Sequence, residues 1–317
     1  MLKYLIKRLL TIIPIFFGIT AIIYILLNMA PGSALDVLAG SESNVSPEQL
    51  EALKVSLGLD KPILIRYLMW LGDLFRGDLG TSYYNGQEVM KAISQRIMPS
   101  LMLTGTGVIL AILFSLPLGI MAAYKPYSMW DKVSNVIALS GSVLPNFFLS
   151  LVLVYVFALK LKILPSMGMH TGTNTSFLDL VWHLTLPAFV ICFGTMGNII
   201  KQTRGACLEV FNEEYMKTAR SKGISEAAVI IRHGFRNALI PVVTTVLLQI
   251  PHIIGGSTIT EQIFGWPGIG SQMISSINNR DYPMVMGIAV ILALTVLATN
   301  ILLDIVYGLV DPRISYE

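Results

Sequence analysis

Long apolar runs separated by short charged segments dominate this sequence of 317 residues. A helix rises about 1.5 Å per residue, so about 20 apolar residues are needed to cross a bilayer core of about 30 Å. Six segments reach that length, and we expect an all-α, polytopic membrane protein. They are Leu9–Met29, Ser100–Tyr124, Val133–Leu159, His183–Ile200, Ala238–Ile259 and Met284–Leu309.

The first apolar run starts with basic residues, as a secretory signal peptide does: Lys3, Lys7 and Arg8. It is too long for a typical signal sequence, and no small-x-small cleavage site follows it. We interpret it as a retained first span.

Composition supports a membrane protein and excludes several other classes. Only 13% of the residues are charged and 54% are hydrophobic, whereas about a quarter of a soluble domain is charged. The net charge of +3 is too small and too scattered for nucleic-acid binding. Cys192 and Cys207 have no metal-ligand spacing, so we expect two reduced thiols.

The basic residues indicate an orientation. If the N-terminus is cytoplasmic, the short outside loops hold only Lys160, Lys162 and Arg280. The inside segments then hold Lys3, Lys7, Arg8, Lys125, Lys132, Lys201, Arg204, Lys217, Arg220, Lys222, Arg232, Arg236 and Arg313. The positive-inside rule therefore predicts that both termini are cytoplasmic.

This topology divides the chain into three parts. Residues 1–30 form the N-terminal end and first span, residues 31–99 form an external loop domain, and residues 100–317 form a five-span core. The core carries a cytoplasmic loop over residues 201–237.

The external loop predicts two helices. Ser46 is an N-cap, Pro47 and Gln49 fit the first turn, and Gly58 ends the first helix. The second helix follows Pro62, and its apolar face is predicted to pack on the membrane domain. That face comprises Leu64, Leu68, Leu71 and Phe75.

The cytoplasmic loop carries a charged helix–turn–helix pattern. Asn212 is the predicted N-cap, and Glu213 pairs with Lys217 in the favourable order. Gly223 fits the C′ position, where φ is usually positive. The pattern predicts a helix of about ten residues, a turn, and a second helix that continues toward the fifth span.

This short helix needs a surface to pack on, because it is marginal alone in water. Its small apolar face consists of Tyr215, Met216 and Ala219. One interpretation is an amphipathic connector on the bilayer surface. The other is a helix that docks on a cytosolic partner, for which the small Ala219 suits a close approach.

The segment EEYMKTARSKGISEAAVIIRHGFRNALIP (213–241) resembles the EAA loop of ABC importer permeases. The match includes Ile240–Pro241, and Tyr215 occupies the family's first alanine position. In that family the loop is the coupling helix, which docks on an ATP-hydrolysing subunit. The resemblance assigns this role to Glu213, Glu214, Tyr215, Ala219, Arg220 and Gly223.

The rest of the chain resembles the B-type membrane subunit of dipeptide, oligopeptide and nickel importers. The resemblance includes LGLDKPILIRYLMWLGDLFRGDLGTSY (57–83), SLPLGIMAA (115–123), ITEQIFGWPGIG (259–270), RDYPMV (280–285) and DIVYGLVDPRI (304–314). Ser33 departs from the family, which often has an acid there. A charge-dependent role at that position is therefore in doubt.

The resemblance implies the fold of a type I ABC importer permease with six spans, carrying oligopeptides or dipeptides across a bacterial inner membrane. Nickel or another small solute is the alternative cargo. It also implies four partner subunits: a second homologous permease, two ABC ATPases and an external substrate-binding protein.

The sequence lacks the motifs of an enzyme. No G-x-x-x-x-G-K-[ST] motif is present, so ATP and Mg are expected on partner subunits and no cofactor or metal on this chain. No catalytic triad, metal-protease motif or paired carboxylates occur either. We interpret all four histidines as ordinary residues: His170, His183, His233 and His252.

Polar residues recur on one face of the fifth predicted span. They are Thr245, Gln249, His252 and Gly256. Spaced i, i+4, i+7 and i+11, they form a stripe that faces away from lipid. This stripe either lines the translocation path or makes helix–helix hydrogen bonds inside one bundle.

The loop before the last span is too rich in glycine and polar groups to face lipid. The resemblance implies an external gate at Trp266, Pro267 and Gly268. The alternative is a plain turn in which Trp266 is an interfacial anchor.

Two rival functions remain at this stage: a self-sufficient channel or ion-coupled carrier, and a membrane scaffold. A scarcity of acids and bases inside the spans argues against ion coupling. Four prolines are predicted to kink spans: Pro145, Pro187, Pro241 and Pro251.

Overall fold

The computed structural model describes residues 2–29 and 47–310, in which the regular secondary structure is helical apart from one isolated bridge between Thr81 and Glu88. Ser46 and Ser33 lie outside the described residues. The helices are α1 (Leu2–Met29), α3 (Pro47–Ser56), α4 (Ile63–Phe75), α5 (Val89–Tyr124), α6 (Met129–Val143), α7 (Asn146–Leu153), η1 (Val154–Lys160), α8 (Phe177–Phe211), α9 (Glu214–Ser221), α10 (Glu226–Ala228), η2 (Val229–Phe235), α11 (Leu239–Leu247), α12 (Ile250–Gly255), α13 (Thr258–Ile263), α14 (Ile269–Asn278) and α15 (Tyr282–Val310).

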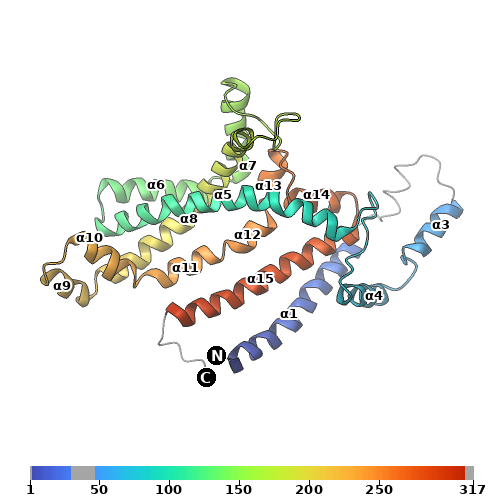
Figure 1. Cartoon of the computed structure of the whole chain (residues 1–317), viewed down its shortest axis with the longest axis horizontal. Coiled ribbons are helices and arrows are strands. Elements are labelled where there is room, and N and C mark those ends of the chain that lie inside the picture. The colour runs from blue at the N-terminus through green and yellow to red at the C-terminus, as the bar shows by residue number, and fades with distance from the viewer. Residues whose placement is uncertain (1, 30–46, 311–317) are drawn as a thin grey trace.

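The predicted all-α membrane architecture is confirmed. Five helical segments of the described chain are long and apolar enough to cross a membrane, and a bent pair brings the number to six if it forms one span. α5, α6 and α8 run along the long axis in Figure 1, α1 and α15 cross it obliquely, and α9 and α3 lie at its two ends. The fifth span is the run α11–α12–α13.

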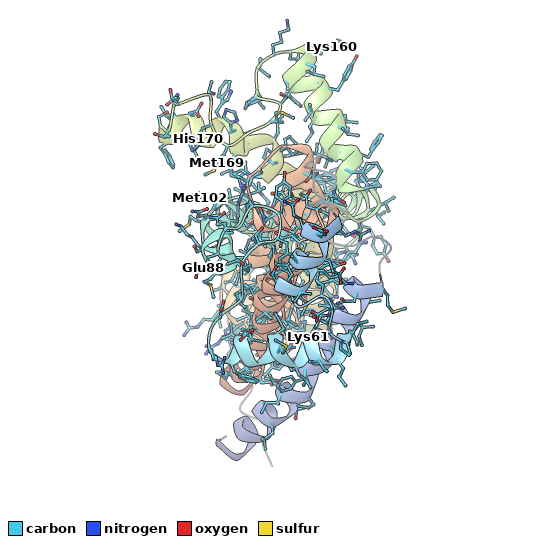
Figure 2. All side chains as sticks on the ribbon, turned by 90° about the vertical axis from the view of Figure 1, so that its right-hand side faces the viewer. Lys61, Glu88, Met102, Lys160, Met169 and His170 are labelled. Atoms are coloured by element: carbon cyan, nitrogen blue, oxygen red, sulfur yellow. The ribbon has the colours of Figure 1, made fainter. Side chains whose placement is uncertain are left out.

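The third span differs from the prediction of one helix over Val133–Leu159. Here α6 and the α7–η1 segment meet at an angle of 101°. Pro145 cannot donate a backbone hydrogen bond and disfavours a helical residue before it, and Leu144 is extended with φ −70° and ψ 120°. The α7 segment therefore leaves the bundle, and Lys160 lies at its far end, well away from Lys61 (Figures 1 and 2).

Small residues let α5 and α8 pack closely at the centre of the bundle. A Cβ on Gly107 would lie 2.7 Å from Ile191 Cβ, and one on Gly119 would lie 2.7 Å from Thr203 Cβ. Glycines at such crossings allow two backbones to approach. These two helices form the frame on which the other elements are placed.

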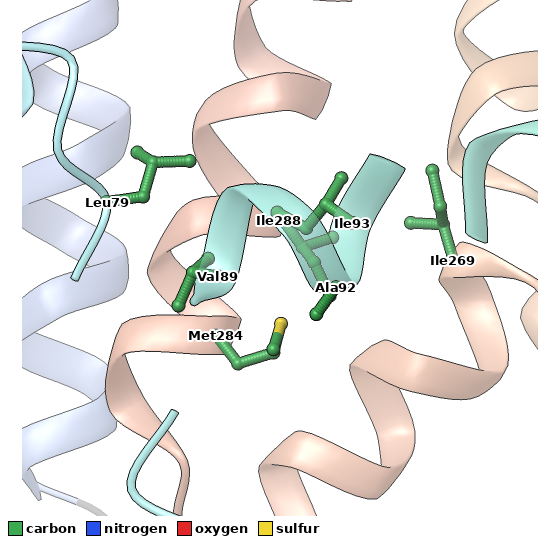
Figure 3. Close-up of a cluster of buried hydrophobic side chains, with 7 residues drawn as sticks. All are labelled: Leu79, Val89, Ala92, Ile93, Ile269, Met284 and Ile288. Carbon is green, nitrogen blue, oxygen red and sulfur yellow. The ribbon is translucent and has the colours of Figure 1, made fainter. Parts of the chain in front are cut away.

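A hydrophobic cluster packs the N-terminal end of α5 against α14 and α15 (Figure 3). It consists of Leu79, Val89, Ala92, Ile93, Ile269, Met284 and Ile288. Beside it, Asp281 accepts hydrogen bonds from Ser82 Oγ and from Tyr83 N, the latter at 3.0 Å. The sequence motifs GTSY and RDYP, about 200 positions apart, are thus parts of one structural unit.

The predicted packing face of α4 is only partly correct, since Leu71 is partly buried and the Phe75 ring lies 6.2 Å from the Phe17 ring of α1. Leu64, Leu68 and Phe75 are 68%, 57% and 74% exposed. The helix also contacts α1 through polar groups outside that face: Tyr67 Oη lies 3.0 Å from Thr20 Oγ1, and Arg66 donates to Asn28 Oδ1 at 2.7 Å. Polar groups with specific partners, which hydropathy does not register, decide the orientation of this helix.

Candidate functional site

A cavity of about 500 Å³ lies between α5, α8, α12 and the break between α6 and α7. Gln249, His252 and Gly256 of the predicted stripe line it. Thr245 is not among the lining residues, and its hydroxyl donates to Pro241 O at 2.9 Å. The stripe is divided because the helix is interrupted between α11 and α12.

The wall of this cavity is polar but carries almost no formal charge. Its polar side chains are Thr104, Ser142, Asn146, Thr195, Asn198, Gln249, His252 and Ser257. Hydroxyl and carboxamide groups both donate and accept hydrogen bonds. No Asp, Glu, Lys or Arg is among the lining residues. The cavity can therefore hydrogen-bond a polar solute, and a charged group reaches its edge through Lys201, whose Nζ donates to Ser142 Oγ at 3.0 Å.

Both interrupted spans meet at this cavity. Leu144, at the bend of the third span, lines it, and so does Gly256, where the fifth span is interrupted with φ +74°. Irregular backbone at membrane depth is tolerated where it is buried in protein or lines a polar cavity. The interruptions and the polar wall are therefore parts of one arrangement.

The predicted gate loop packs against protein. Trp266 is 1% exposed, and its Nε1 donates to Pro99 O on α5 at 2.8 Å. An interfacial anchor would have a ring exposed to lipid headgroups, so that interpretation of Trp266 was wrong. Pro267 is partly buried and Gly268 fully buried in the same loop.

Glu261 is the residue of this region that the sequence interpretation missed. It is 0% exposed, although it belongs to α13 at the C-terminal end of the fifth span. Its carboxylate accepts hydrogen bonds from Ser100 Oγ and Ser271 N, each at 2.8 Å. An acid between two apolar runs could have predicted a buried carboxylate, but the sequence interpretation assigned Glu261 to a polar loop.

The predicted coupling helix is shorter than expected. α9 spans Glu214–Ser221 with Glu213 at the N-cap, and Asn212 instead ends α8, where its Nδ2 donates to Leu208 O. Lys217 pairs with Glu214 at 2.7 Å, not with Glu213. The prediction of Asn212 as N-cap and of a Glu213–Lys217 pair was therefore wrong.

The apolar face of α9 is covered by the chain itself. Met216 is 0% and Ala219 7% exposed, and both pack against Val229 of η2 and Phe211 of α8. Ala219 therefore cannot approach a partner's groove directly. Tyr215 is 41% exposed and accepts a hydrogen bond from Asn237 at 3.1 Å.

The turn after α9 has the predicted left-handed glycine. Gly223 has φ +71° and is exposed. Arg220 and Glu226 form an ion pair of 3.2 Å across the turn. Gly234 was missed: a Cβ there would overlap the Phe211 ring and lie 3.1 Å from Met216 Cε, so this glycine permits α9 to pack on η2.

The second helix of the loop does not run into the fifth span as predicted. The helical segment ends at Phe235, and a turn over residues 236–238 precedes α11. Pro241 in the first turn of α11 cannot donate to Asn237 O, and its ring would clash with that carbonyl in a continuous helix.

Cys192 and Cys207 are buried and form no disulfide. Among the described residues, no group of three or more His, Cys, Asp or Glu could hold a metal ion. His170 and His183 both lie beside Asp179, at 3.2 and 3.8 Å, at the N-terminal end of α8.

Comparison with known proteins gives matches over nearly the whole chain. The family model described as binding-protein-dependent transport system inner membrane component matches residues 115–316, and the model for the N-terminal part of such membrane components matches residues 1–104. The oligopeptide transport system permease protein AppB of Bacillus subtilis is 39% identical, over 100% of both chains.

Two other relatives have similar coverage. A putative peptide permease protein of Brucella suis is 38% identical over 99% of both chains. The glutathione transport system permease protein GsiC of Escherichia coli O6:H1 is 35% identical over 100% of both chains.

Proposed function

Because the chain belongs to the family of binding-protein-dependent transport system inner membrane components, we propose that it forms one half of the translocation path of an ATP-driven peptide importer. Membership of this family establishes several properties of the chain. The chain is a non-catalytic, multi-pass component of the inner membrane, in a family without bound cofactors, and it works with an ATPase and a binding protein.

The observation that carries the peptide assignment is the chemistry of the 500 Å³ cavity. A peptide group taken out of bulk water needs hydrogen-bonding partners for its N–H and C=O. The carboxamides of Asn146, Asn198 and Gln249 offer donors and acceptors to both. Peptides of different side-chain charge can pass such a wall, and two of the relatives named above are described as peptide permeases.

The alternative cargoes fit less well. Glutathione is itself a small peptide, but a path dedicated to its two carboxylates would favour arginine or lysine, which the lining lacks. Nickel favours imidazole ligands, and His252 is the one histidine in the lining.

A second permease would complete the path. In the 18-residue apolar window of the span Leu239–Ile263 only 6% of the residues are buried, against 39% in the corresponding windows of the spans that contain α5 and α8. A span that carries polar cavity residues and remains this open needs a protein partner rather than lipid. We therefore favour a heterodimer with a homologous permease over a self-sufficient channel, carrier or scaffold. The distribution of basic residues supports an orientation with both termini in the cytoplasm.

The α9 segment is proposed to couple the spans to two cytosolic ATPases. The outward face of α9 carries Glu214 and Lys217, whose side chains are 85% and 67% exposed. Its inward face is fixed to η2 and α8 through Met216 and Ala219. A movement imposed on the outer face by an ATPase would therefore be transmitted to α8.

The experiment is to purify the tagged chain from its own cell under gentle conditions and to identify the co-purifying subunits and the ligand of the binding protein. Two ATPases, a second permease and a peptide-loaded binding protein would support the proposal. Recovery of this chain alone with transport activity would reject it, and a nickel-loaded binding protein would reject the peptide assignment.

Variants test the path directly in the reconstituted complex. Gln249→Leu removes a lining carboxamide at similar size and should lower peptide uptake about tenfold, the worth of about one hydrogen bond to the passing peptide. Thr245→Val, one turn away on α11 and outside the lining, is the matched control and should leave uptake unchanged. Equal effects of the two variants would refute the assignment of the cavity.

A further inference from the structure

The carboxylate of Glu261 joins three parts of the chain that are distant in sequence. Oε1 accepts from Ser100 Oγ of α5, and Oε2 accepts from Ser271 N of α14. Ser100 Oγ in turn accepts from Ile269 N at 2.8 Å. The backbone also participates, since Trp266 N donates to Glu261 O at 2.8 Å. One buried side chain thus fixes α13 to α5 and to the gate loop.

Glycines leave room for this carboxylate. A Cβ on Gly256 or Gly268 would overlap the Glu261 carboxyl group, and one on Gly270 would lie 2.7 Å from Thr258 Cα. Gly256 also lines the polar cavity. The carboxylate therefore lies directly behind the cavity wall, at the point where the fifth span is interrupted.

All the groups that bond this carboxylate are donors. Besides the Ser100 hydroxyl and the Ser271 amide, the N–H groups of Gly270 and Ser257 face it. A carboxylate with two oxygens can accept from all of them, whereas a carboxamide can accept through only one oxygen. The cradle therefore specifies an acid at this position rather than any polar residue of that size.

We propose that Glu261 is a positioning residue that locks the gate loop, α13 and the Pro99–Ser100 region of α5 into one rigid block, which moves relative to α11–α12 about Gly256. Gly256 suits a hinge because φ +74° is accessible to glycine without strain. Trp266, held by Pro99 O, belongs to the block. The gate loop then moves together with the Pro99–Ser100 region of α5 and not independently of it. The inference rests on the proposed transport function for its activity readout only.

The test uses the assembled complex and the variant Glu261→Gln. The amide oxygen can still accept from Ser100 Oγ, but the NH₂ group faces Ser271 N, which is also a donor. The hydrogen bond between residue 261 and Ser271 is therefore lost. We expect kcat for uptake to fall at least about tenfold, the worth of one charge-assisted hydrogen bond. KM for the loaded binding protein should stay unchanged. A purely structural role would lower the yield of complex without this split.

Two further variants keep the test decisive. Ser100→Ala removes the hydrogen bond from Ser100 Oγ to Glu261 and should also lower kcat while KM stays unchanged. This variant tests the proposal even if Glu261→Gln assembles poorly. Gln262→Ala changes the exposed neighbour on the same helix and should behave as wild type.

Spin labels provide a readout that does not require a substrate. The labels are attached to the variant Met98→Cys/Gln262→Cys, because Met98 before Ser100 on α5 and Gln262 beside Glu261 on α13 are both exposed. The native Cys192 and Cys207 of this chain are buried and should not react with the label. The Met98–Gln262 distance should be sharp and equal with and without a non-hydrolysable ATP analogue. Glu261→Gln should broaden it.

The outcomes separate the two proposals. A wild-type distance that changes with nucleotide, or an unchanged distribution in Glu261→Gln, would overturn the rigid block. If the distances behave as expected while the wild-type complex takes up no peptide, the block stands and the proposed cargo fails.

Discussion

Asp131 forms a well-connected ion pair on the side of the bundle that carries α9, the proposed coupling helix, and its removal tests how that end is held. Its carboxylate accepts from Arg204 Nε at 2.7 Å and from Arg204 Nη2 at 3.0 Å. It also accepts from Tyr127 N at 2.9 Å and Asn135 Nδ2 at 2.8 Å. One side chain thus ties the α5–α6 loop and the start of α6 to α8. The perturbation is Asp131→Asn.

The expected loss of stability follows from the hydrogen bonds that an amide at position 131 cannot accept. It retains one acceptor oxygen but turns an NH₂ group toward donors of Arg204 or Tyr127. Removing one partner of a buried pair costs about 3–5 kcal/mol, and a hydrogen bond to a charged group contributes about 1.5–3 kcal/mol. The Asp131 side chain is 4% exposed, but Arg204 is 27% exposed and water can replace part of the loss. We expect a loss of about 2 kcal/mol.

The assay is thermal unfolding of the assembled complex in detergent, followed by tryptophan fluorescence. For 317 residues the unfolding entropy is about 0.67 kcal/mol/K, so a loss of about 2 kcal/mol corresponds to a midpoint lower by about 3 °C. Lys217→Gln is the matched control, because the Lys217–Glu214 pair is exposed on both sides and should contribute under about 0.5 kcal/mol.

The double variant Asp131→Asn/Arg204→Gln decides between an ion pair and general packing. If the pair carries the energy, the two changes are strongly non-additive, since the second removes a partner already lost. A midpoint shift for Asp131→Asn no larger than that for Lys217→Gln would refute the reasoning.

Three further predictions concern single positions. Gly223→Val places a β-branched residue at φ +71°, which costs about 1–2 kcal/mol, and should lower binding-protein-stimulated ATPase activity while the protein still inserts; unchanged coupling would reject the assigned turn. Gly234→Ala should have a similar effect by forcing Phe211 away, whereas Gly205→Ala, with nothing within 4 Å of the added Cβ, should not. Burial raises the pKa of Tyr83 to about 12, so the folded state holds this proton longer than the unfolded state and stability should fall between about pH 10 and pH 12. Tyr83→Phe should flatten that loss in a pH series of unfolding midpoints, and an unchanged slope would contradict it.

Hydropathy and turn chemistry predicted most of the helical architecture. Long apolar runs define spans because every backbone polar group in lipid must be satisfied within the helix. Gly223 was predictable because a helix end that needs positive φ selects glycine. These features depend on residues close in sequence, so a single sequence suffices to predict them.

The errors have a common physical origin in contacts between distant segments. The burial of Met216 and Ala219 depends on Val229 and Phe211, and the orientation of α4 depends on Arg66 reaching Asn28. Glu261 is stabilised by donors from α5 and α14. Local pattern gives the amphipathic face of a helix but not the partner that the face meets.

The two interrupted spans also explain why the cavity is polar. In the third span the bend at Leu144–Pro145 brings Ser142 and Asn146 to the wall, and in the fifth the interruption brings Gln249 and Gly256 there. A straight helix satisfies its own backbone and presents only side chains, whereas a broken one also exposes backbone groups. Those groups need polar neighbours or a polar solute. A substrate that carries its own donors and acceptors can meet this need in passing, and a rigid block above Gly256 would determine when the cavity is open to it.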